Sequence, residues 1–412
     1  MVARYYYFKE VFFMIAIGVD VSKGKSTVSA CKPFGEIIFG PLDVAHTSND
    51  LKELAESIKS LNEECRIVLE HTGKYYQPIA RYLFDLGYFV SVVNPKLIHD
   101  FGNNSIRNVK TDKADSLKIA NYTLANWDSL IPYDFEEDIR MQLKACCRQY
   151  YFYLNYRTSL KNNLISILDQ TFPDCNYLFT SQKADGSTKW MDFALRFWHR
   201  DCVTKHSRSE FTKIYNAWCK KHGYRPSDSK ASSIYDFAKA CVPSLPYNDS
   251  TKALVKIASI PLLATCKATG ELILEMNSLA SQLPEYPVVM SMPGIGPTMC
   301  PQIIAEVGNI RRYKDKHSLV AFAGVDAPPF QSGSFSSKRR KITKRGSANL
   351  RRVTFQIVCG ILQRKAEDDP VYQFVRMKQA AGKPYYVYMV AGCNKFLRVY
   401  YGRVKEYLDD LA

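Results

Sequence analysis

Apolar and polar residues over the first third of the chain follow strand and helix periods in turn. Five short runs are rich in β-branched and apolar residues and are bounded by turn residues, and two runs between them have helical spacing. The predicted strands are Met14–Ser22, Ser26–Cys31, Glu36–Gly40, Arg66–Glu70 and Phe89–Val93, and the predicted helices are Leu51–Leu61 and Tyr75–Leu86. Three hairpin-connected strands followed by alternating helix and strand predict a mixed sheet flanked by helices.

The order of these elements matches a ribonuclease-H-like α/β domain, which we place over residues 14–130. The middle of the chain follows a different pattern. From Phe135 to Phe172 there is neither Gly nor Pro, and a helix of that length would extend roughly 55 Å. Its apolar residues recur at spacings of three and four, as in a coiled coil interrupted by Arg157 and Lys161. These apolar positions are Leu143, Cys147, Tyr150, Leu154, Leu164 and Leu168.

So long a helix needs a partner to bury its apolar stripe, which favours an intermolecular role and leaves packing within one chain as the alternative. We place coiled-coil arms over residues 131–285, with Ala264–Leu283 as the returning arm. Short helices are inserted over about 174–250, where aromatic residues are interrupted by Gly and Pro. In this insert Cys202, His206, Cys219 and His222 loosely resemble zinc-ligand spacing, but ordinary core and surface roles are the favoured interpretation.

Residues 286–412 are predicted to form a mostly α-helical C-terminal domain. It begins with a Pro-Gly-Ile-Gly-Pro turn before the apolar helix Thr298–Val307. Gly294 and Gly296 in this turn would let the backbone approach a phosphate, and the helix N-terminus would add amide donors. The alternative is an ordinary turn.

The charge distribution strengthens the case for a polyanionic partner. The formal net charge is +16, and between Ala327 and Ala366 there are ten Lys or Arg and no Asp or Glu. A solvated surface normally mixes both signs, so this tract predicts a phosphate-binding surface. The residues predicted to bind nucleic acid are Lys338, Arg339, Arg340, Lys341, Lys344, Arg345, Arg351 and Arg352, together with the two glycines of the turn.

Cysteine usage and hydropathy bear on location. The twelve cysteines include no Cys-x-x-Cys pair, which favours free thiols in a reducing cytoplasm. No span of about 20 apolar residues is evident, so a membrane helix is not expected. The apolar run Val11–Val19 is short and leads into a strand, which argues against a signal peptide, and Met14 is a candidate start.

Four carboxylates stand where a divalent metal site could form. Asp20 and Glu70 end two strands that are adjacent in the expected fold. Asp112 and Asp115 are three residues apart near the start of a helix that Thr111 could cap, so they share a face. Mg²⁺ prefers oxygen ligands and needs local neutralisation, so the four together predict a magnesium site. Each taken alone would more often be a solvated or capping residue.

The basic tract also contains candidate nucleophiles. A serine hydroxyl attacks a phosphate only when it is activated and when cations stabilise the transition state. Ser332 lies beside Gly333, just upstream of the basic run, but spacing alone does not distinguish it from Ser334, Ser336, Ser337 and Ser347. A flexible Ser/Gly loop is the alternative.

The chain resembles transposases of the IS110 type, also called DEDD transposases. The resemblance rests on blocks that are individually weak but occur together and in order outside the middle of the chain. These blocks are Gly18-Val19-Asp20-Val21-Ser22, Glu70-His71-Thr72-Gly73, Val93-Asn94-Pro95, Lys110-Thr111-Asp112-Lys113-Ala114-Asp115, Pro293-Gly294-Ile295-Gly296-Pro297, Ala323-Gly324-Val325-Asp326, Gln331-Ser332-Gly333, Lys344-Arg345-Gly346, Leu350-Arg351-Arg352 and Gly382-Lys383-Pro384. The segment of residues 174–250 is longer than the corresponding segment in compact members of the family.

The resemblance implies a RuvC-like recombinase domain joined to a transposase domain that carries a serine. It implies that Asp20, Glu70, Asp112 and Asp115 bind Mg²⁺ and that Ser332 is the nucleophile of a covalent phosphoserine intermediate. It also implies donor and target DNA as substrates, a structured non-coding bridge RNA as guide, and a homo-oligomer of two to four chains. A RuvC-like endonuclease that uses water, or a scaffold that only binds nucleic acid, would lack the serine step.

Overall fold

The computed structural model describes residues 14–101, 111–133, 138–181, 183, 185–328, 331–332, 335–336 and 341–411. The chain forms two compact units, Met1–Phe135 and Glu136–Ala412. We call them the N-terminal unit and the C-terminal unit. The helical arms and the C-terminal helices, predicted as separate domains, both belong to the C-terminal unit.

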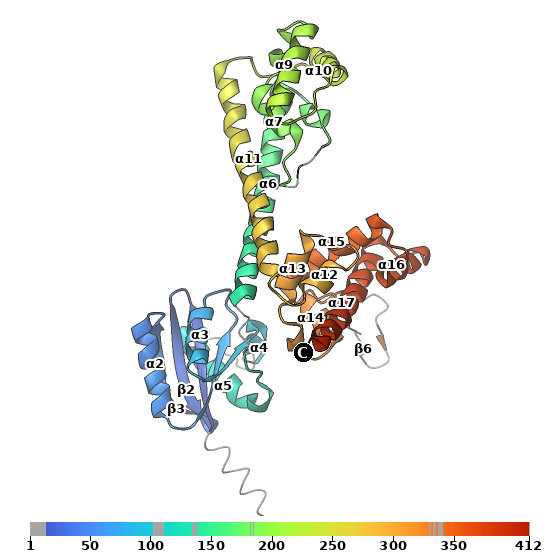
Figure 1. Ribbon diagram of the computed structural model, residues 1–412. Helices are drawn as coiled ribbons and strands as arrows, with labels where there is room; N and C mark the ends of the chain where they lie inside the picture. The colour runs from blue at the N-terminus through green and yellow to red at the C-terminus, as the bar shows by residue number, and fades with distance from the viewer. Residues whose placement is uncertain are drawn as a thin grey trace, which may run out of the picture. The chain divides into compact units, whose positions relative to one another are not determined.

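The N-terminal unit contains a five-stranded sheet in the order β3-β2-β1-β4-β5 (Figure 1). The central strand β1 pairs antiparallel with β2 and parallel with β4, while β2–β3 is antiparallel and β4–β5 is parallel. The mixed sheet predicted from the sequence is therefore confirmed, as is its RuvC-like class. The strands are β1 (Met14–Ser22), β2 (Lys25–Lys32), β3 (Glu36–Ala45), β4 (Glu64–Glu70) and β5 (Phe89–Val93).

Helices cover the two faces of this sheet. On one face, Ile15, Ile17 and Val19 of β1 pack in a core with α2 (Ser48–Ser60) and α3 (Gln77–Asp85). The alternate residues of β1 face α5 (Asp112–Ala125), since Ala16 packs with Ala120. Asp20 continues this second register, so it lies on the α5 face. The short helix α4 spans Pro95–Phe101.

Two long helices dominate the first part of the C-terminal unit, α6 (Asp138–Thr171) and α11 (Asp249–Ala280), which lie side by side (Figure 1). The 34 residues of α6 extend about 51 Å. Its predicted apolar positions are buried, with only Leu154 partly so, and α11 of the same chain covers them. An intermolecular partner is therefore not required to bury this stripe, and the within-chain alternative accounts for it.

The returning arm begins at Asp249, so the prediction that it starts at Ala264 was wrong. Asn248 caps the helix by accepting from the amide of Thr251, and the helix then runs through Pro261. A proline inside a helix leaves the carbonyl four residues earlier without its amide partner. Here that residue is Ile257, which is exposed, so water can satisfy the carbonyl.

Helix α11 is also long and apolar enough to cross a membrane, with a mean hydropathy of 1.4 over 18 residues. Passing this test by length and composition does not contradict the expectation that the chain lacks a membrane helix. Its buried residues, such as Leu262 and Met276, pack against α6 and neighbouring helices, as in the core helix of a folded domain.

The inserted residues form a small helical cluster around an aromatic core of their own, to which the outer ends of both arms contribute. Its helices are η3 (Cys175–Leu178), α7 (Lys189–Arg196), α8 (Asp201–Thr204), α9 (Arg208–Lys221) and α10 (Asp228–Ala240). Cys202 and Cys219 are buried in this core, and Cys219 lies 3.5 Å from the Lys189 ammonium. Across the described residues, no three His, Cys, Asp or Glu side chains converge as metal ligands.

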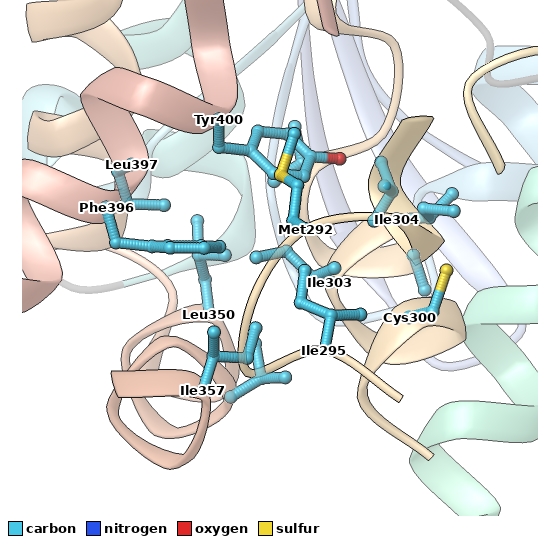
Figure 2. Close-up of a cluster of buried hydrophobic side chains, with 14 of the residues drawn as sticks. Met292, Ile295, Cys300, Ile303, Ile304, Leu350, Ile357, Phe396, Leu397 and Tyr400 are labelled. Carbon is cyan, nitrogen blue, oxygen red and sulfur yellow. The ribbon is translucent and has the colours of Figure 1, made fainter. Parts of the chain in front are cut away.

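The remaining helices surround a second core, part of which is shown in Figure 2. In that view Phe396 and Tyr400 of the last helix approach Ile303, Ile357 and Met292. The mostly helical C-terminal part is as predicted. Its helices are α12 (Tyr286–Met290), α13 (Met299–Val307), η4 (Ile310–Arg312), α14 (Lys316–Ala323), α15 (Ala348–Arg364), α16 (Pro370–Ala380) and α17 (Tyr385–Asp410).

Candidate active site

Strand register places the first two predicted carboxylates next to each other. The parallel pairing of β1 and β4 ends with Val19 opposite Leu69, so the next residues, Asp20 and Glu70, are level at the ends of adjacent strands. Both side chains are partly buried. The arrangement predicted from the sequence, with two carboxylates converging at one edge of the sheet, is consistent with this register.

Helix α5 brings the other two carboxylates to the same face. Gly18 of β1 lies directly beneath the helix, where an added Cβ would overlap the carbonyl oxygen of Ser116 and the amide nitrogen of Ala120. Beside this contact, the buried hydroxyls of Ser29 and Ser116 are hydrogen-bonded at 2.8 Å. The close approach and the hydroxyl pair fix α5 on the sheet.

The first turn of α5 is fixed by a cap. Thr111 accepts a hydrogen bond from the amide of Ala114 at 3.2 Å, as the sequence predicts. Asp112 and Asp115 therefore lie in the first helical turn, near Asp20. Carboxylates at this end of a helix are stabilised by its dipole.

The carboxylates repel one another electrostatically. Burial, followed by the charges of Asp115 and Asp112, raises the pKa of Asp20 to about 6. Burial, followed by the charges of Asp20 and Asp115, also raises the pKa of Glu70. A cation bound among these carboxylates would relieve this repulsion.

The four side chains fit Mg²⁺ by donor chemistry, because all their donors are carboxylate oxygens. Burial, and then charges within this group, raise the pKa of Asp20 and of Glu70, although the described residues contain no closed ligand set. The residues that would hold the ion are thus Asp20, Glu70, Asp112 and Asp115.

A fifth carboxylate on this face has a different role. Thr27 is paired with Asp20 on one side and with Asp43 on the other. Asp43 accepts a hydrogen bond from Thr27 at 2.7 Å and forms an ion pair with Lys25 at 3.0 Å. These partners lower the pKa of Asp43. Its charge is balanced within the protein, so it flanks the four carboxylates without joining them.

The sequence analysis did not identify the parts that position α5. Gly18, Ser29 and Ser116 do not resemble ligands, and their importance comes from packing. A glycine inside a strand often marks close approach of another backbone, and Gly18 is such a signal.

In the C-terminal unit, Ser332 lies in a short β-hairpin. Strand β6 (Gln331–Ser332) pairs antiparallel with β7 (Phe335–Ser336), and Ser332 is opposite Phe335. Gly333, Ser334, Ser337, Lys338, Arg339 and Arg340 lie outside the described residues. The structure thus places the backbone of Ser332 in the hairpin.

The two chain segments that lead into and out of this hairpin are bonded to each other; we call them the hairpin legs, residues 323–328 and 341–347. Thr343 donates from its amide to the Asp326 carbonyl at 3.0 Å and from its hydroxyl to the Asp326 carboxylate at 2.6 Å. Lys344 donates from its amide to the Gly324 carbonyl at 3.1 Å. The legs therefore give the hairpin a fixed base.

Two predicted nucleic-acid-binding arginines make internal contacts near the legs. Arg351 donates to the carbonyls of Ala323 and Gly346, at 2.9 and 3.0 Å, and so ties the two legs together. The Arg352 guanidinium lies 4.1 Å from the centre of the Tyr151 ring. These contacts give both residues a packing role, and phosphate contact by either stays a prediction.

The structure also narrows the set of candidate serines. Ser347 caps α15 by accepting from the amide of Leu350 at 3.1 Å, and its hydroxyl donates to the buried carboxylate of Glu306 at 2.9 Å. A hydroxyl engaged in this way supports the fold and is poorly placed to attack a substrate.

The glycine turn is packed internally at its first glycine. Gly294 has φ of 79°, and an added Cβ would lie 2.6 Å from the carbonyl oxygen of Ile357. This requirement for glycine comes from packing against α15, so it does not by itself indicate phosphate binding. Gly296 has more room, with Arg364 the nearest group at 4.0 Å.

Lys341, Lys344 and Arg345 of the basic tract are exposed. We expect simultaneous replacement of Arg339, Arg340 and Lys341 by Gln to weaken DNA binding and to flatten its salt dependence. The expected change is roughly one unit of the slope of log K against log salt per lost phosphate contact. Binding titrations between low and physiological salt measure this slope. An unchanged slope would remove these residues from the interface.

Comparison with known proteins covers both candidate sites. A family model described as a transposase of the DEDD IS110 type matches residues 17–173, and a model of the IS116/IS110/IS902 transposase family matches residues 286–373. The first range contains the four carboxylates and the second contains Ser332. Fold and sites thus define an enzyme that rearranges DNA. Since the two models together match more than half of the sequence, the chain belongs to the IS110 family of transposases.

Curated relatives agree with this placement. A 44.8 kDa protein of insertion element IS116 from Streptomyces clavuligerus is 23% identical over 319 residues, covering 77% of each chain. Pilin gene-inverting proteins from Moraxella lacunata and Moraxella bovis are each 19% identical over 340 residues, covering 82% of this chain and 80% of their own.

Proposed function

We propose that this transposase cuts and rejoins donor and target DNA through a covalent phosphoserine intermediate on Ser332, with Mg²⁺ bound by Asp20, Glu70, Asp112 and Asp115. The observation that carries the proposal is the placement of these carboxylates, with Asp20 and Glu70 level on adjacent strands and Asp112 and Asp115 in the first turn of α5. Burial, and then the charges of Asp115 and Asp112, raise the pKa of Asp20 to about 6. The pilin gene-inverting relatives favour rearrangement of DNA segments as the outcome. The enzyme would act in the cytoplasm.

The chemistry of the serine step conserves the phosphodiester. The Ser332 hydroxyl oxygen forms a bond to a DNA phosphorus and loses its proton, while the bond from phosphorus to the departing sugar oxygen breaks and that oxygen gains a proton. Attack by a new sugar hydroxyl reverses the exchange and releases the serine. Because the phosphate ester bond is retained throughout, rejoining needs no ATP. Bound Mg²⁺ would neutralise charge that develops on the phosphate.

The residues of the chain contribute binding and position to this step. The hairpin legs fix the base of the Ser332 hairpin, and the basic tract supplies cations for the phosphate backbone. Selection of sequence is proposed to come from base pairing with a structured bridge RNA, as the IS110 resemblance implies, and the active form is proposed to be a dimer or tetramer.

The second candidate function is a metal-dependent endonuclease in which water replaces Ser332. The carboxylates alone would support it, because a RuvC-like site can activate water. The two functions differ in whether DNA becomes attached to the protein.

A trapping experiment separates them. Purified protein, Mg²⁺ and end-labelled element-junction DNA, with the flanking transcript of the element, are mixed and stopped in denaturant. We expect a labelled protein–DNA band that is lost in Ser332→Ala and after chelation of Mg²⁺. Ser336→Ala, in the partner strand of the same hairpin, is the matched control and should keep the band.

Cleaved DNA that forms equally in wild type and Ser332→Ala, with no protein-linked band, would establish the water-dependent nuclease. A band that survives in Ser332→Ala but disappears in Ser336→Ala would move the nucleophile to Ser336.

A further inference from the structure

An exposed aromatic surface lies at the turn between α16 and α17. Tyr386 is 73% exposed, and Met377, Tyr385 and Val387 beside it in the sequence or across the turn are also exposed. We call these four residues the tyrosine patch. Exposed apolar residues that gather at one turn favour a binding site, whereas single exposed apolar residues are ordinary.

Neighbouring aromatic side chains hold the two tyrosine rings of the patch in place. Tyr385 contacts Phe355 of α15 and Tyr388 of α17 in edge-to-face geometry, with ring centres 6.4 and 5.5 Å apart. Tyr386 in turn meets Tyr385 edge-to-face at 5.2 Å. An aromatic ring anchored in this way loses little conformational entropy when a ligand stacks on it.

The surroundings of the tyrosine patch are basic. From Pro370 to Lys405 there are seven Lys or Arg and no Asp or Glu, and α15 also lacks acidic residues. Arg376, Lys378 and Lys383 flank the patch, and none of the ion pairs among the described residues involves them. A protein partner would usually bring mixed charge to such a surface, whereas a nucleic-acid strand brings only phosphate.

Aromatic rings combined with cations suit an unpaired nucleobase better than a duplex. Bases in a duplex are already stacked and present only their edges and their phosphates. An unpaired base exposes its π-face, which stacks on Tyr while neighbouring Lys or Arg contact the phosphates. Cutting and exchange of strands, as in the proposed function on which this inference rests, would produce unpaired nucleotides.

We propose that the tyrosine patch is a stacking platform for an unpaired nucleotide, with Tyr386 against the base and Lys383 against the adjacent phosphate. This platform is distinct from the Ser332 hairpin and from the basic tract. It would hold a single-stranded segment, of DNA or of RNA, during strand exchange.

The test uses the full-length protein and fluorescence anisotropy with labelled oligothymidylate, oligouridylate and a mixed-sequence duplex. We expect Tyr386→Leu to weaken single-strand binding by about 5- to 100-fold, with duplex binding unchanged. Tyr386→Trp should preserve or strengthen single-strand binding. Tyr177→Leu is the matched control, since Tyr177 is 77% exposed outside the patch, and its affinity should be that of wild type.

Salt dependence separates stacking from charge. Tyr386→Leu should leave the slope of log K against log salt unchanged, whereas Lys383→Gln should flatten it by about 0.7 for a single strand. A loss confined to oligouridylate would identify the base as one of RNA, and a loss confined to oligothymidylate would identify it as one of DNA.

Equal losses on duplex and single strand, or wild-type affinity in Tyr386→Leu, would overturn the platform. A change in sedimentation with unchanged oligonucleotide affinity would show instead that the patch joins two copies of the chain. The trapping assay keeps the two proposals apart. If Tyr386→Leu binds normally while wild type forms the covalent band, the platform alone fails. If single-strand binding depends on Tyr386 but no covalent band forms, the serine mechanism alone fails.

Discussion

Asp20→Asn is expected to lower DNA cleavage by at least about a thousandfold while leaving DNA binding largely intact. The substitution preserves the shape of the side chain but removes a charge that a divalent cation would need. The basic tract, which is expected to supply most of the binding, is in the other unit and is unaffected. A cleavage assay and a binding titration on the same preparation measure the two effects. Loss of binding in parallel with cleavage would contradict a metal-binding role.

The same substitution is expected to stabilise the metal-free protein at neutral pH. An acid whose folded pKa is raised destabilises the fold above that pKa, and the penalty disappears below its unfolded pKa. For Asp20 the window runs from 3.8 to about 6. A shift of this size corresponds to about 3 kcal/mol for a buried group, which screening at this half-buried site reduces to about 1 to 2 kcal/mol.

Thermal unfolding without metal at pH 7 and at pH 3.5 tests whether the substitution stabilises the protein as expected. Asp20→Asn should unfold at a higher temperature than wild type at pH 7, and the difference should vanish at pH 3.5. Asp43→Asn is the matched control, because Asp43 lies on the same face but is paired with Lys25 and Thr27. It should retain cleavage and should not gain stability. A gain in Asp43→Asn equal to that in Asp20→Asn would show that the face responds to net charge alone.

Gly18→Ala is expected to destabilise the N-terminal unit by about 3 kcal/mol or more, although it adds a single methyl group. The new carbon would overlap backbone atoms of Ser116 and Ala120, and backbone cannot move aside as a flexible side chain can. Either α5 shifts away from the sheet, carrying Asp112 and Asp115 with it, or the unit unfolds. In both cases cleavage should be lost.

Hydrogen exchange on β1 and α5, together with thermal unfolding, measures this effect. Gly402→Ala provides the control, since Gly402 lies within α17 and a Cβ there meets nothing within 4 Å. Alanine is favoured over glycine inside a helix, so this variant should be unchanged or more stable by up to about 1 kcal/mol. Wild-type protection of α5 in Gly18→Ala would refute the close approach.

The sequence predicted the sheet well because its strands are short, apolar and bounded by turns. In the structure, alternation along β1 places Asp20 on the face opposite Ile17 and Val19. What the sequence could not supply was the depth at which α5 sits, because that depends on a missing side chain at Gly18 and on the Ser29–Ser116 contact between residues far apart in the chain. Periodicity describes single elements and carries no such information.

The two helical arms show a different limit of prediction from the sequence. The apolar stripe of α6 was found from its spacing, but nothing in that spacing says whether the covering helix belongs to the same chain. The start of α11 was also missed. The helix begins after the Asn248 cap and continues through Pro261, which the exposed position of Ile257 makes tolerable. The role of Ser332 came from family resemblance, since several serines fit the local pattern equally well, whereas the phosphate-binding role of the basic tract was predicted from its charge.

The inserted helices join the arms in a way that allows the length of the insert to vary. The amides of Ser244 and Leu245 both donate to the carbonyl of Gln170 at 2.9 Å, so the insert leaves and rejoins the arms at nearly the same point. A segment whose two ends are neighbours can be lengthened or shortened without altering the path of α6 or α11. The length of the insert is therefore independent of the pairing of the two arms. Members of the family can therefore differ in size here while the helices that carry the rest of the unit keep their pairing.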